Sequence, residues 1–385
     1  EDPSEYSSGS YYQDCYWDDV YDYFVTGDNN NLYFTVPAEQ GSGWGAPSFK
    51  ANVGLLVAYE KGYLPEAYVD YANGDDDNTG DSLTTAFKTM DHALSEVEDG
   101  GTIYVSGTYE LDGVDVNGIS INKNVNIVGL GDDATFDANG NGRIFNIGAY
   151  AVDLSNLAFV NGNAAGTSDK KGGALYVNGA TLTIDNCKFI DNTAGTSSSY
   201  GGAINLKSSS TTITDSYFEG NTALYTGGAI NAENSNILLD ISGCTFTENG
   251  LTGTGWAYGG TICSYGTVTI DKSIFYGNIL SNTNGRSINM YSAGSLSITN
   301  SVLLDGEGSV KSQATSTTLE NNWWGNNDTT KDTNPKDLGY TTNNVDSYLY
   351  LALSTAASDL RINTPIDIDI EFVSSVGDAV NLPDL

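Results

Sequence analysis

The chain has 385 residues, of which 49 are Asp or Glu and 15 are Lys or Arg, so its formal net charge is -34. This charge argues against a nucleic-acid binder, because phosphate recognition needs a basic surface. A hydrophobic content of 39% with 11% aromatic residues is too rich for a disordered chain, and we expect a folded core. The 45 glycines, with Asn, Ser and Thr between short apolar runs, are typical of a strand-rich, turn-dense protein.

The composition predicts an exported protein without a membrane span. No run approaches the ~18 apolar residues of a transmembrane helix, and the longest runs, 53–59 and 348–353, have the length of strands. The chain begins with Glu1, which fits removal of a signal peptide or a trimmed end. An acidic, Lys-poor and Tyr-rich surface suits an exposed location.

The first predicted segment, residues 1–67, is dense in Tyr and Asp, as in YYQDCYWDDVYDYF. We expect it either to cap the rest of the chain or to contact a partner. Residues 83–98 then carry the only convincing helix periodicity. The apolar face of this predicted helix comprises Ala86, Met90, Ala93, Leu94 and Val97.

Internal repeats decide the predicted architecture. The Gly-Gly pairs that start at 172, 201, 227 and 259 lie 29, 26 and 32 residues apart. Each unit alternates apolar and polar residues and holds about three short strands separated by Gly, Asn and Ser turns. This pattern predicts an all-β fold, a right-handed parallel β-helix of about nine coils over residues 68–328, with helix 83–98 covering its N-terminal end.

Stacked coils place like residues in columns, and the sequence supplies four of them. The first buried column is predicted to contain Ile184, Ile213, Ile241, Ile270, Ile298 and Leu319. The second contains Phe189, Phe218, Phe246, Phe275, Leu303 and Trp324. Between them runs a small-residue column of Cys187, Ser216, Cys244, Ser273 and Ser301. An Asn ladder follows at a turn, formed by Asn192, Asn221, Asn249 and Asn278. We interpret all four columns as scaffold.

The C-terminal part differs from the repeats. Residues 329–345 are polar and predicted to be a linker, and residues 346–385 contain two predicted strands, 348–353 and 366–372. Two strands cannot close a sandwich, which needs about seven. Either the chain is a fragment of a longer protein, or these strands pair with the solenoid or with another molecule.

Four parts of the sequence resemble the adhesin-like surface proteins of methanogenic archaea, whose passenger is a pectate-lyase-like parallel β-helix. They are the repeat I-x-N-C-x-F-x-x-N, the G-G-A-I starts, the opening YVDYANGDDDNTGDSLTTAFKTMDHAL with its following GGTIYVSGTY, and the closing NNWWGNND. The resemblance covers about residues 68–328, and residues 346–385 look like the start of an immunoglobulin-like domain. It implies a non-enzymatic protein attached to the cell wall or cell surface that binds glycans or proteins of other cells. It supplies no catalytic residues.

A polysaccharide lyase or hydrolase is the alternative, because this fold often hosts such enzymes. Lyases of this kind need a basic residue beside calcium-binding carboxylates, but the solenoid's Lys and Arg residues share no column. Hydrolases need paired Asp residues, often with a His, and the only His, His92, falls in the cap helix. Asp185, Asp215 and Asp271 are predicted to occupy one repeat position, which would form a carboxylate ladder. We predict no catalytic residue.

The loop GDDDNTGD, residues 74–81, concentrates oxygen ligands around glycines, as calcium sites do. It departs from the EF-hand pattern, since the twelfth position counted from Asp75 is Ala86. A solvated turn is the other interpretation. The ligands of a structural calcium would be Asp75, Asp76, Asp77 and Asp81. No other cofactor is predicted.

The four cysteines lie at 15, 187, 244 and 263. Cys187 and Cys244 share a column two coils apart, about 10 Å, which is beyond disulfide reach. We therefore predict buried free thiols for these two and leave the state of Cys15 and Cys263 open.

The period varies in one loop per coil. The distance from a Gly-Gly pair to the Phe column stays between 16 and 19 residues, whereas the distance from that Phe to the next pair ranges from 9 to 13. The loops between them end in aromatic residues, which are Tyr200, Tyr225, Trp256 and Tyr258. These rings either anchor the loops on the sheet or bind a carbohydrate or protein. We predict an adhesin that binds through them, with a self-assembling subunit that adds N- or C-terminal strands to a neighbour as the second hypothesis.

Overall fold

The structure is a computed structural model that describes residues 62–111, 115–253, 258–279, 287–291, 294–306, 309–325, 335, 341, 343–354 and 369–376. The chain divides into two compact units, residues 1–60 and 61–385, and all described residues belong to the second. Most of the predicted N-terminal segment, with Cys15, therefore lies outside the described residues. No helix in the described part of the chain is long and apolar enough to cross a membrane.

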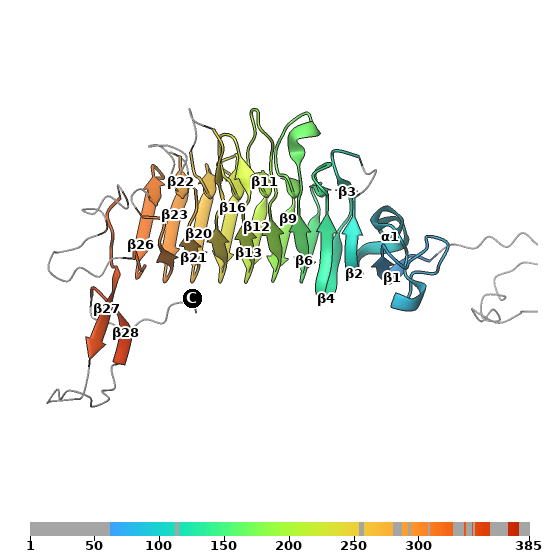
Figure 1. Ribbon diagram of the computed structural model, residues 1–385, viewed down its shortest axis with the longest axis horizontal. Coiled ribbons are helices and arrows are strands. Elements are labelled where there is room, and N and C mark those ends of the chain that lie inside the picture. The colour runs from blue at the N-terminus through green and yellow to red at the C-terminus, as the bar shows by residue number, and fades with distance from the viewer. Residues whose placement is uncertain are drawn as a thin grey trace, which may run out of the picture. The chain divides into compact units, whose positions relative to one another are not determined.

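The described unit is a right-handed parallel β-helix, as predicted. Strands of successive coils pair in parallel and stack along one axis, from the cyan β2 to the orange β26 (Figure 1). Three strand ladders run along this axis. Two of them form one 16-stranded sheet, because β2 and β4 bend and contribute to both, and the third is an eight-stranded sheet. Eight successive coils thus contribute to the third ladder, close to the nine expected.

The first ladder comprises β1 (Leu64–Asp70), β2 (Val97–Glu110), β4 (Val125–Asp137), β6 (Ala151–Ser155), β9 (Thr181–Asp185), β12 (Ser210–Thr214), β16 (Leu238–Ser242), β20 (Thr267–Asp271), β23 (Ser295–Thr299) and β26 (Ser316–Glu320). The second continues from the ends of β2 and β4 into β7 (Ala158–Val160), β10 (Lys188–Ile190), β13 (Tyr217–Glu219), β17 (Thr245–Thr247), β21 (Ile274–Tyr276) and β24 (Val302–Leu303). The third comprises β3 (Ile119–Ile121), β5 (Phe145–Ile147), β8 (Leu175–Asn178), β11 (Ile204–Lys207), β15 (Ile230–Ala232), β19 (Ile262–Ser264), β22 (Ile288–Met290) and β25 (Val310–Ser312). Two smaller elements are the strand pair β14 (Thr222–Ala223) with β18 (Gly250–Leu251) and a 3-10 helix at Ala164–Gly166.

The N-terminal end of the solenoid is covered by β1 and by the helix α1 (Met90–Glu96) (Figure 1). The single helix predicted over 83–98 is wrong in extent, because a 3-10 helix at Leu83–Thr85 and α1 are separated by extended backbone. Asp76 holds this break by accepting the backbone N–H groups of Lys88 and Thr89. The predicted apolar face is nevertheless buried in full.

The predicted inward columns are confirmed by the strand register. The isoleucines from Ile184 to Ile298 and Leu319 are paired residue for residue and buried. The phenylalanines stack face to face, with centroids 4.7 Å apart at each step from Phe189 to Phe275 and interplanar angles of 7° to 11°. A stack at the strand spacing buries large apolar rings without voids.

The Asn ladder is also confirmed, and its hydrogen bonds form a continuous chain. The Asn192 backbone N–H and side-chain Nδ2 both donate to Asn221 Oδ1, at 3.0 and 2.9 Å. Asn221 donates to Asn249 in the same way, and Asn249 to Asn278. Each amide nitrogen also donates to a carbonyl of the Phe column one coil back. Burial of these amides is tolerated because their polar atoms are paired.

The ladder ends on a carboxylate that the sequence did not reveal. Asp305 accepts the Asn278 backbone N–H at 2.9 Å and its Nδ2 at 3.0 Å, and the Ser287 hydroxyl donates to it. Asp305 lies two residues after Leu303, whereas each Asn lies three residues after its Phe. Burial raises the pKa of Asp305 above its usual 3.8, against the opposing effect of these donors.

The two C-terminal strands, β27 (Leu349–Ser354) and β28 (Asp369–Ser374), pair with each other in antiparallel register. Residues 366–368 of the second predicted strand lie outside the described residues. The hairpin leaves the end of the solenoid (Figure 1), and its base covers an apolar patch on the second ladder. Phe372 meets the Trp323 ring edge-on at 5.4 Å, beside the buried Ile274 and Val302.

We predict that Asp305→Asn stabilises the protein at neutral pH. A carboxyl group whose folded pKa is raised contributes full stability below its unfolded pKa, and this contribution is lost as pH rises through the folded pKa. The gain in melting temperature should therefore be larger at pH 7 than at pH 3 in thermal unfolding. Asp240→Asn removes the same charge from an exposed site and is the control. Equal gains for both variants, or a gain from Asp305→Asn that does not depend on pH, would contradict the prediction.

Thr211 breaks an apolar column, and we predict that Thr211→Val stabilises the fold. Its side chain is 1% exposed and stacked between Leu182 and Leu239, and its hydroxyl has no hydrogen-bond partner in the structure. Replacing an unpaired buried hydroxyl by a methyl group of similar shape should raise the free energy of unfolding by about 1 kcal/mol. Denaturant titration measures this, and Thr212→Val on the exposed side of the same strand should change it by less than about 0.5 kcal/mol.

Candidate functional site

The outer face of the third ladder gathers tyrosines from successive coils. We call this surface the tyrosine face and define it by Tyr200, Tyr225, Tyr258, Tyr265 and Tyr291. The sequence predicted Tyr200, Tyr225 and Tyr258, and all three lie here, half-buried. The fourth predicted aromatic residue, Trp256, lies outside the described residues.

The Gly-Gly pairs fix the positions of these rings. Immediately before each pair, Lys171, Tyr200, Thr226 and Tyr258 are linked by single parallel bridges from coil to coil. The first glycine of each pair has a positive φ, and a Cβ on Gly201 would lie 2.3 Å from the Ile204 carbonyl oxygen. Only glycine permits this turn, so the residue before it is held in register although the preceding loops differ in length.

A column of polar residues lies beneath the rings. Asn205, Asn231, Cys263 and Asn289 occupy one register position, and their strand neighbours belong to the core, except for the buried Ser264. These side chains therefore point outward, yet each is at most 3% exposed. Asn231 Nδ2 donates to Asn205 Oδ1 at 2.9 Å, and the Thr226 hydroxyl donates to Asn231 Oδ1 at 2.6 Å.

Charged groups lie at the N-terminal side of the tyrosine face. Lys171 Nζ lies 2.8 Å from Glu233 Oε1 and 5.7 Å from the centroid of the Tyr200 ring. The same Glu233 oxygen accepts Asn205 Nδ2 at 2.7 Å. This network crosses three coils and presents a fixed ammonium, a carboxylate and amides beside aromatic faces.

Arg143 anchors the coil next to this network. Its guanidinium is 2% exposed, forms an ion pair with Asp169 at 2.6 Å and donates to the carbonyls of Lys171 and Gly172. It also lies 4.9 Å from the centroid of the Tyr176 ring. Because its donors point at the backbone of the Lys171 turn, Arg143 holds that turn in place and positions Lys171.

At the C-terminal side, Tyr265 and Tyr291 stack with centroids 4.2 Å apart and an interplanar angle of 12°. Tyr258 meets Tyr291 edge-on at 6.0 Å. Burial raises the pKa of Tyr265 and of Tyr291, so both phenols stay neutral at physiological pH and can donate hydrogen bonds. The stack forms a flat aromatic platform.

Several residues of this surface were missed from the sequence. Tyr265, Tyr291 and Glu233 lie two residues beyond the polar column, in a position that is aligned only once the third ladder is known. Arg143 precedes the clear repeats. The sequence signal that could have found them is the alternation within each third-ladder strand. This alternation places 205, 231, 263 and 289 outward.

The predicted calcium loop uses its carboxylates in local hydrogen bonds. Asp76 accepts three hydrogen bonds from Lys88 and Thr89, and Asp81 accepts the hydroxyls of Thr79 and Thr85. Asp75 accepts the backbone N–H of Asp77. In the described ranges, no group of three or more His, Cys, Asp or Glu side chains is placed to hold a metal ion. A structural calcium in this loop stays a prediction.

The predicted carboxylate ladder is wrong. Asp185 and Asp271 share one register position, occupied between them by Thr214 and Ser242, whereas Asp215 lies one residue later. Asp215 has a positive φ and stands at the turn rather than in the strand. Because Thr214 and Ser242 separate Asp185 from Asp271 and Asp215 lies outside the strand, these carboxylates form no continuous row.

No family model and no curated protein matches this chain. Two solved structures resemble it at low identity. A protein described as a rhamnogalacturonan lyase shares 14% identity over 67% of this chain and 82% of its own, with a TM-score of 0.36. A pectin methylesterase in complex with a hexasaccharide shares 13% identity over 66% of this chain and 80% of its own, with a TM-score of 0.33. Both are similar to this chain in fold alone.

We predict that the described cysteines are unreactive in the native protein. Cys187, Cys244 and Cys263 are free and buried, and burial raises the pKa of each thiol to about 12. Since the thiolate is the reactive form, a maleimide at pH 8 should label none of the three in a Cys15→Ser variant, as measured by mass spectrometry. The same variant unfolded in urea should take up three labels. Labelling of native Cys263 would show that the tyrosine face opens.

Proposed function

We propose that this protein is a non-enzymatic adhesin of the cell surface that binds glycans or proteins of other cells through the tyrosine face. The observation that carries the proposal is the alignment of half-buried rings with fixed polar groups across successive coils. Tyr200 and Tyr225 lie 5.9 Å apart on neighbouring coils, beside the Lys171–Glu233 ion pair.

Carbohydrates are recognised by aromatic faces together with planar polar groups, because the rings cover apolar sugar faces and the polar groups pair with hydroxyls. The tyrosine face offers both in one register. Its rings are held by stacking and by the glycine turns, so little conformational entropy is lost when a ligand binds. An extended ligand is favoured, since the rings follow the solenoid axis over several coils.

The proposal includes a location outside the cell. An extracellular protein attached to a cell wall or cell surface suits the strong negative charge and the resemblance in the repeats and the closing NNWWGNND motif to archaeal adhesin-like proteins. The ligand would then be a surface glycan or protein of another cell.

A self-assembling subunit is the second candidate. The observation in its favour is the β27–β28 hairpin, whose two described strands form a sheet of their own while its base packs on the solenoid. A two-stranded sheet gains stability from each further strand that it pairs with. Another molecule could add a strand there. Light scattering across a range of protein concentrations distinguishes a persistent monomer from an assembling subunit.

The test of the adhesin proposal combines binding and cleavage. Immobilised cell-wall and plant polysaccharides are incubated with the purified full chain, with and without calcium, and both retention and polysaccharide chain length are measured. Binding to at least one polysaccharide, without shortening, is expected. Tyr200→Ala and Tyr225→Ala should each weaken that binding about tenfold, which corresponds to about 1.4 kcal/mol.

Tyr276→Ala is the matched control, because Tyr276 is 42% exposed on the second ladder, away from the tyrosine face. It should leave binding unchanged. Shortened polysaccharide would overturn the non-enzymatic proposal. Equal losses from all three variants would show that binding occurs elsewhere.

A further inference from the structure

A separate cavity lies at the N-terminal end of the solenoid, where the cap meets the first coils. Its volume is about 510 Å³, within the ~300–1,000 Å³ range of small-molecule sites. It is formed by the end of β1, the start of α1, the end of β2 and the strand β3. None of the tyrosine face residues lines it.

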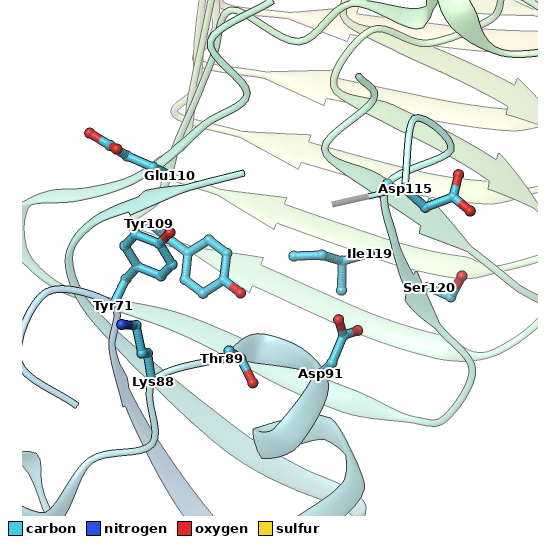
Figure 2. A pocket seen from close by; sticks show the side chains of 10 residues that line it. Tyr71, Lys88, Thr89, Asp91, Tyr109, Glu110, Asp115, Ile119 and Ser120 are labelled. Atoms are coloured by element: carbon cyan, nitrogen blue, oxygen red, sulfur yellow. The ribbon is translucent and has the colours of Figure 1, made fainter. Parts of the chain in front are cut away.

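One wall of the cavity is aromatic. Tyr71 and Tyr109 have ring centroids 4.9 Å apart and lie together on one side, as Figure 2 shows. Tyr109 is 3% exposed, and its hydroxyl accepts the Met90 backbone N–H at 3.2 Å. Burial raises the pKa of Tyr109 to about 12, so the ring stays neutral. Tyr71 is the more accessible of the two rings.

Acidic residues outnumber basic ones on the remaining walls. Asp91, Glu110 and Asp115 line the cavity, with Lys88 as the one cation among its lining residues. The Asp91 carboxylate points toward Ile119 and into the space between the walls (Figure 2). Within the described chain, the Asp91 side chain makes no hydrogen bond or ion pair, so its acceptors are available to a ligand.

The cavity already holds one ammonium group of the chain itself. Lys88 Nζ lies 5.6 Å from the centroid of the Tyr71 ring and, among the described residues, forms no ion pair. An ammonium group over the face of a tyrosine is a cation–π contact. The Tyr71 ring therefore already accommodates one ammonium, which a ligand ammonium would have to displace, and the lining keeps more carboxylates than cations.

We propose that this cavity binds a primary ammonium group carried by a small ligand, either an amino sugar or a lysine side chain of another protein. The ammonium would lie between the Asp91 carboxylate and the Tyr71 ring, with Asp115 and Glu110 adding negative potential. Carboxylates beside aromatic faces favour cations and disfavour uronates and phosphates. This site does not depend on the tyrosine face.

The test uses matched ligands on the full chain. Dissociation constants are measured by calorimetry for a glucosamine trimer, for the N-acetylglucosamine trimer and for Nα-acetyl-lysine methylamide. Acetylation removes the ammonium charge and leaves the sugar rings, so the acetylated trimer should bind at least ~tenfold more weakly. Comparison of the glucosamine trimer with the lysine derivative identifies the source of the ammonium, because the tighter of the two is the better mimic.

Two substitutions in the cavity should act in opposite directions. Asp91→Asn removes the facing carboxylate and should weaken glucosamine binding about tenfold. Lys88→Gln removes the competing ammonium from the Tyr71 ring and should tighten it. Both residues are exposed, so neither variant is expected to disturb folding.

Asp240→Asn controls for the general attraction of an amine to an acidic protein, since Asp240 is exposed on β16 outside the cavity. It should leave binding unchanged. Equal weakening by Asp240→Asn and Asp91→Asn, equal binding of both trimers, weaker binding by Lys88→Gln, or no binding of either amine would each overturn the proposal.

Discussion

The parallel pairing of each coil with the next is the constraint on which this structure depends. Because the register is constant from coil to coil, a side chain at one position lies against its counterpart at about the strand spacing of 4.7–4.9 Å. Inward positions then become stacks of like apolar groups, as in the phenylalanines spaced by 4.7 Å. Polar positions become hydrogen-bonded ladders, as in the buried asparagines. The same register aligns the outward residues of the tyrosine face from coil to coil.

Two fixed points in each coil reconcile this register with loops of different length. The Asn ladder holds the start of each variable loop, and the Gly-Gly turn holds its end. A Cβ on Gly202 would lie 2.0 Å from the Gly228 carbonyl oxygen, so adjacent coils approach too closely there for any other residue. Loop length therefore changes without moving Tyr200 or Tyr258 out of their column. Residues on such loops can vary while the scaffold stays unchanged.

The repeated parts of the fold could be predicted because one pattern recurs many times. The inward columns, the Asn ladder and the parallel β-helix all follow from period-2 alternation inside a unit of nearly constant length. Asp215 shows where prediction from the repeat fails. It lies in a turn, one residue after the repeat position, and is therefore outside the predicted carboxylate row. The predicted helix 83–98 is longer than α1. The backbone N–H groups of Lys88 and Thr89 donate to Asp76, a contact between distant residues that helix periodicity does not predict.

The candidate sites were less predictable for a physical reason. Tyr200, Tyr225 and Tyr258 stand next to the recurrent glycines and could be found, whereas Arg143 and Glu233 occur once each. Their positions depend on how residues far apart in sequence are brought together, as in the Lys171–Glu233 pair across 62 positions of the chain. The N-terminal cavity is formed entirely by non-repeated segments, so no column in the sequence pointed to it.

In one outward column of the second ladder, the residue types change from polar to apolar where the C-terminal hairpin covers the solenoid. On the second ladder, the position occupied by Lys188, Tyr217 and Thr245 continues as Ile274, Val302 and Trp323. The first three are polar or amphipathic and at least partly exposed, and the last three are at most 8% exposed. Apolar side chains on the outside of a solenoid are stable only under a cover, and Leu349 and Phe372 supply it here. The change of character at Ile274 therefore marks where the solenoid surface becomes an interface with the chain that follows it.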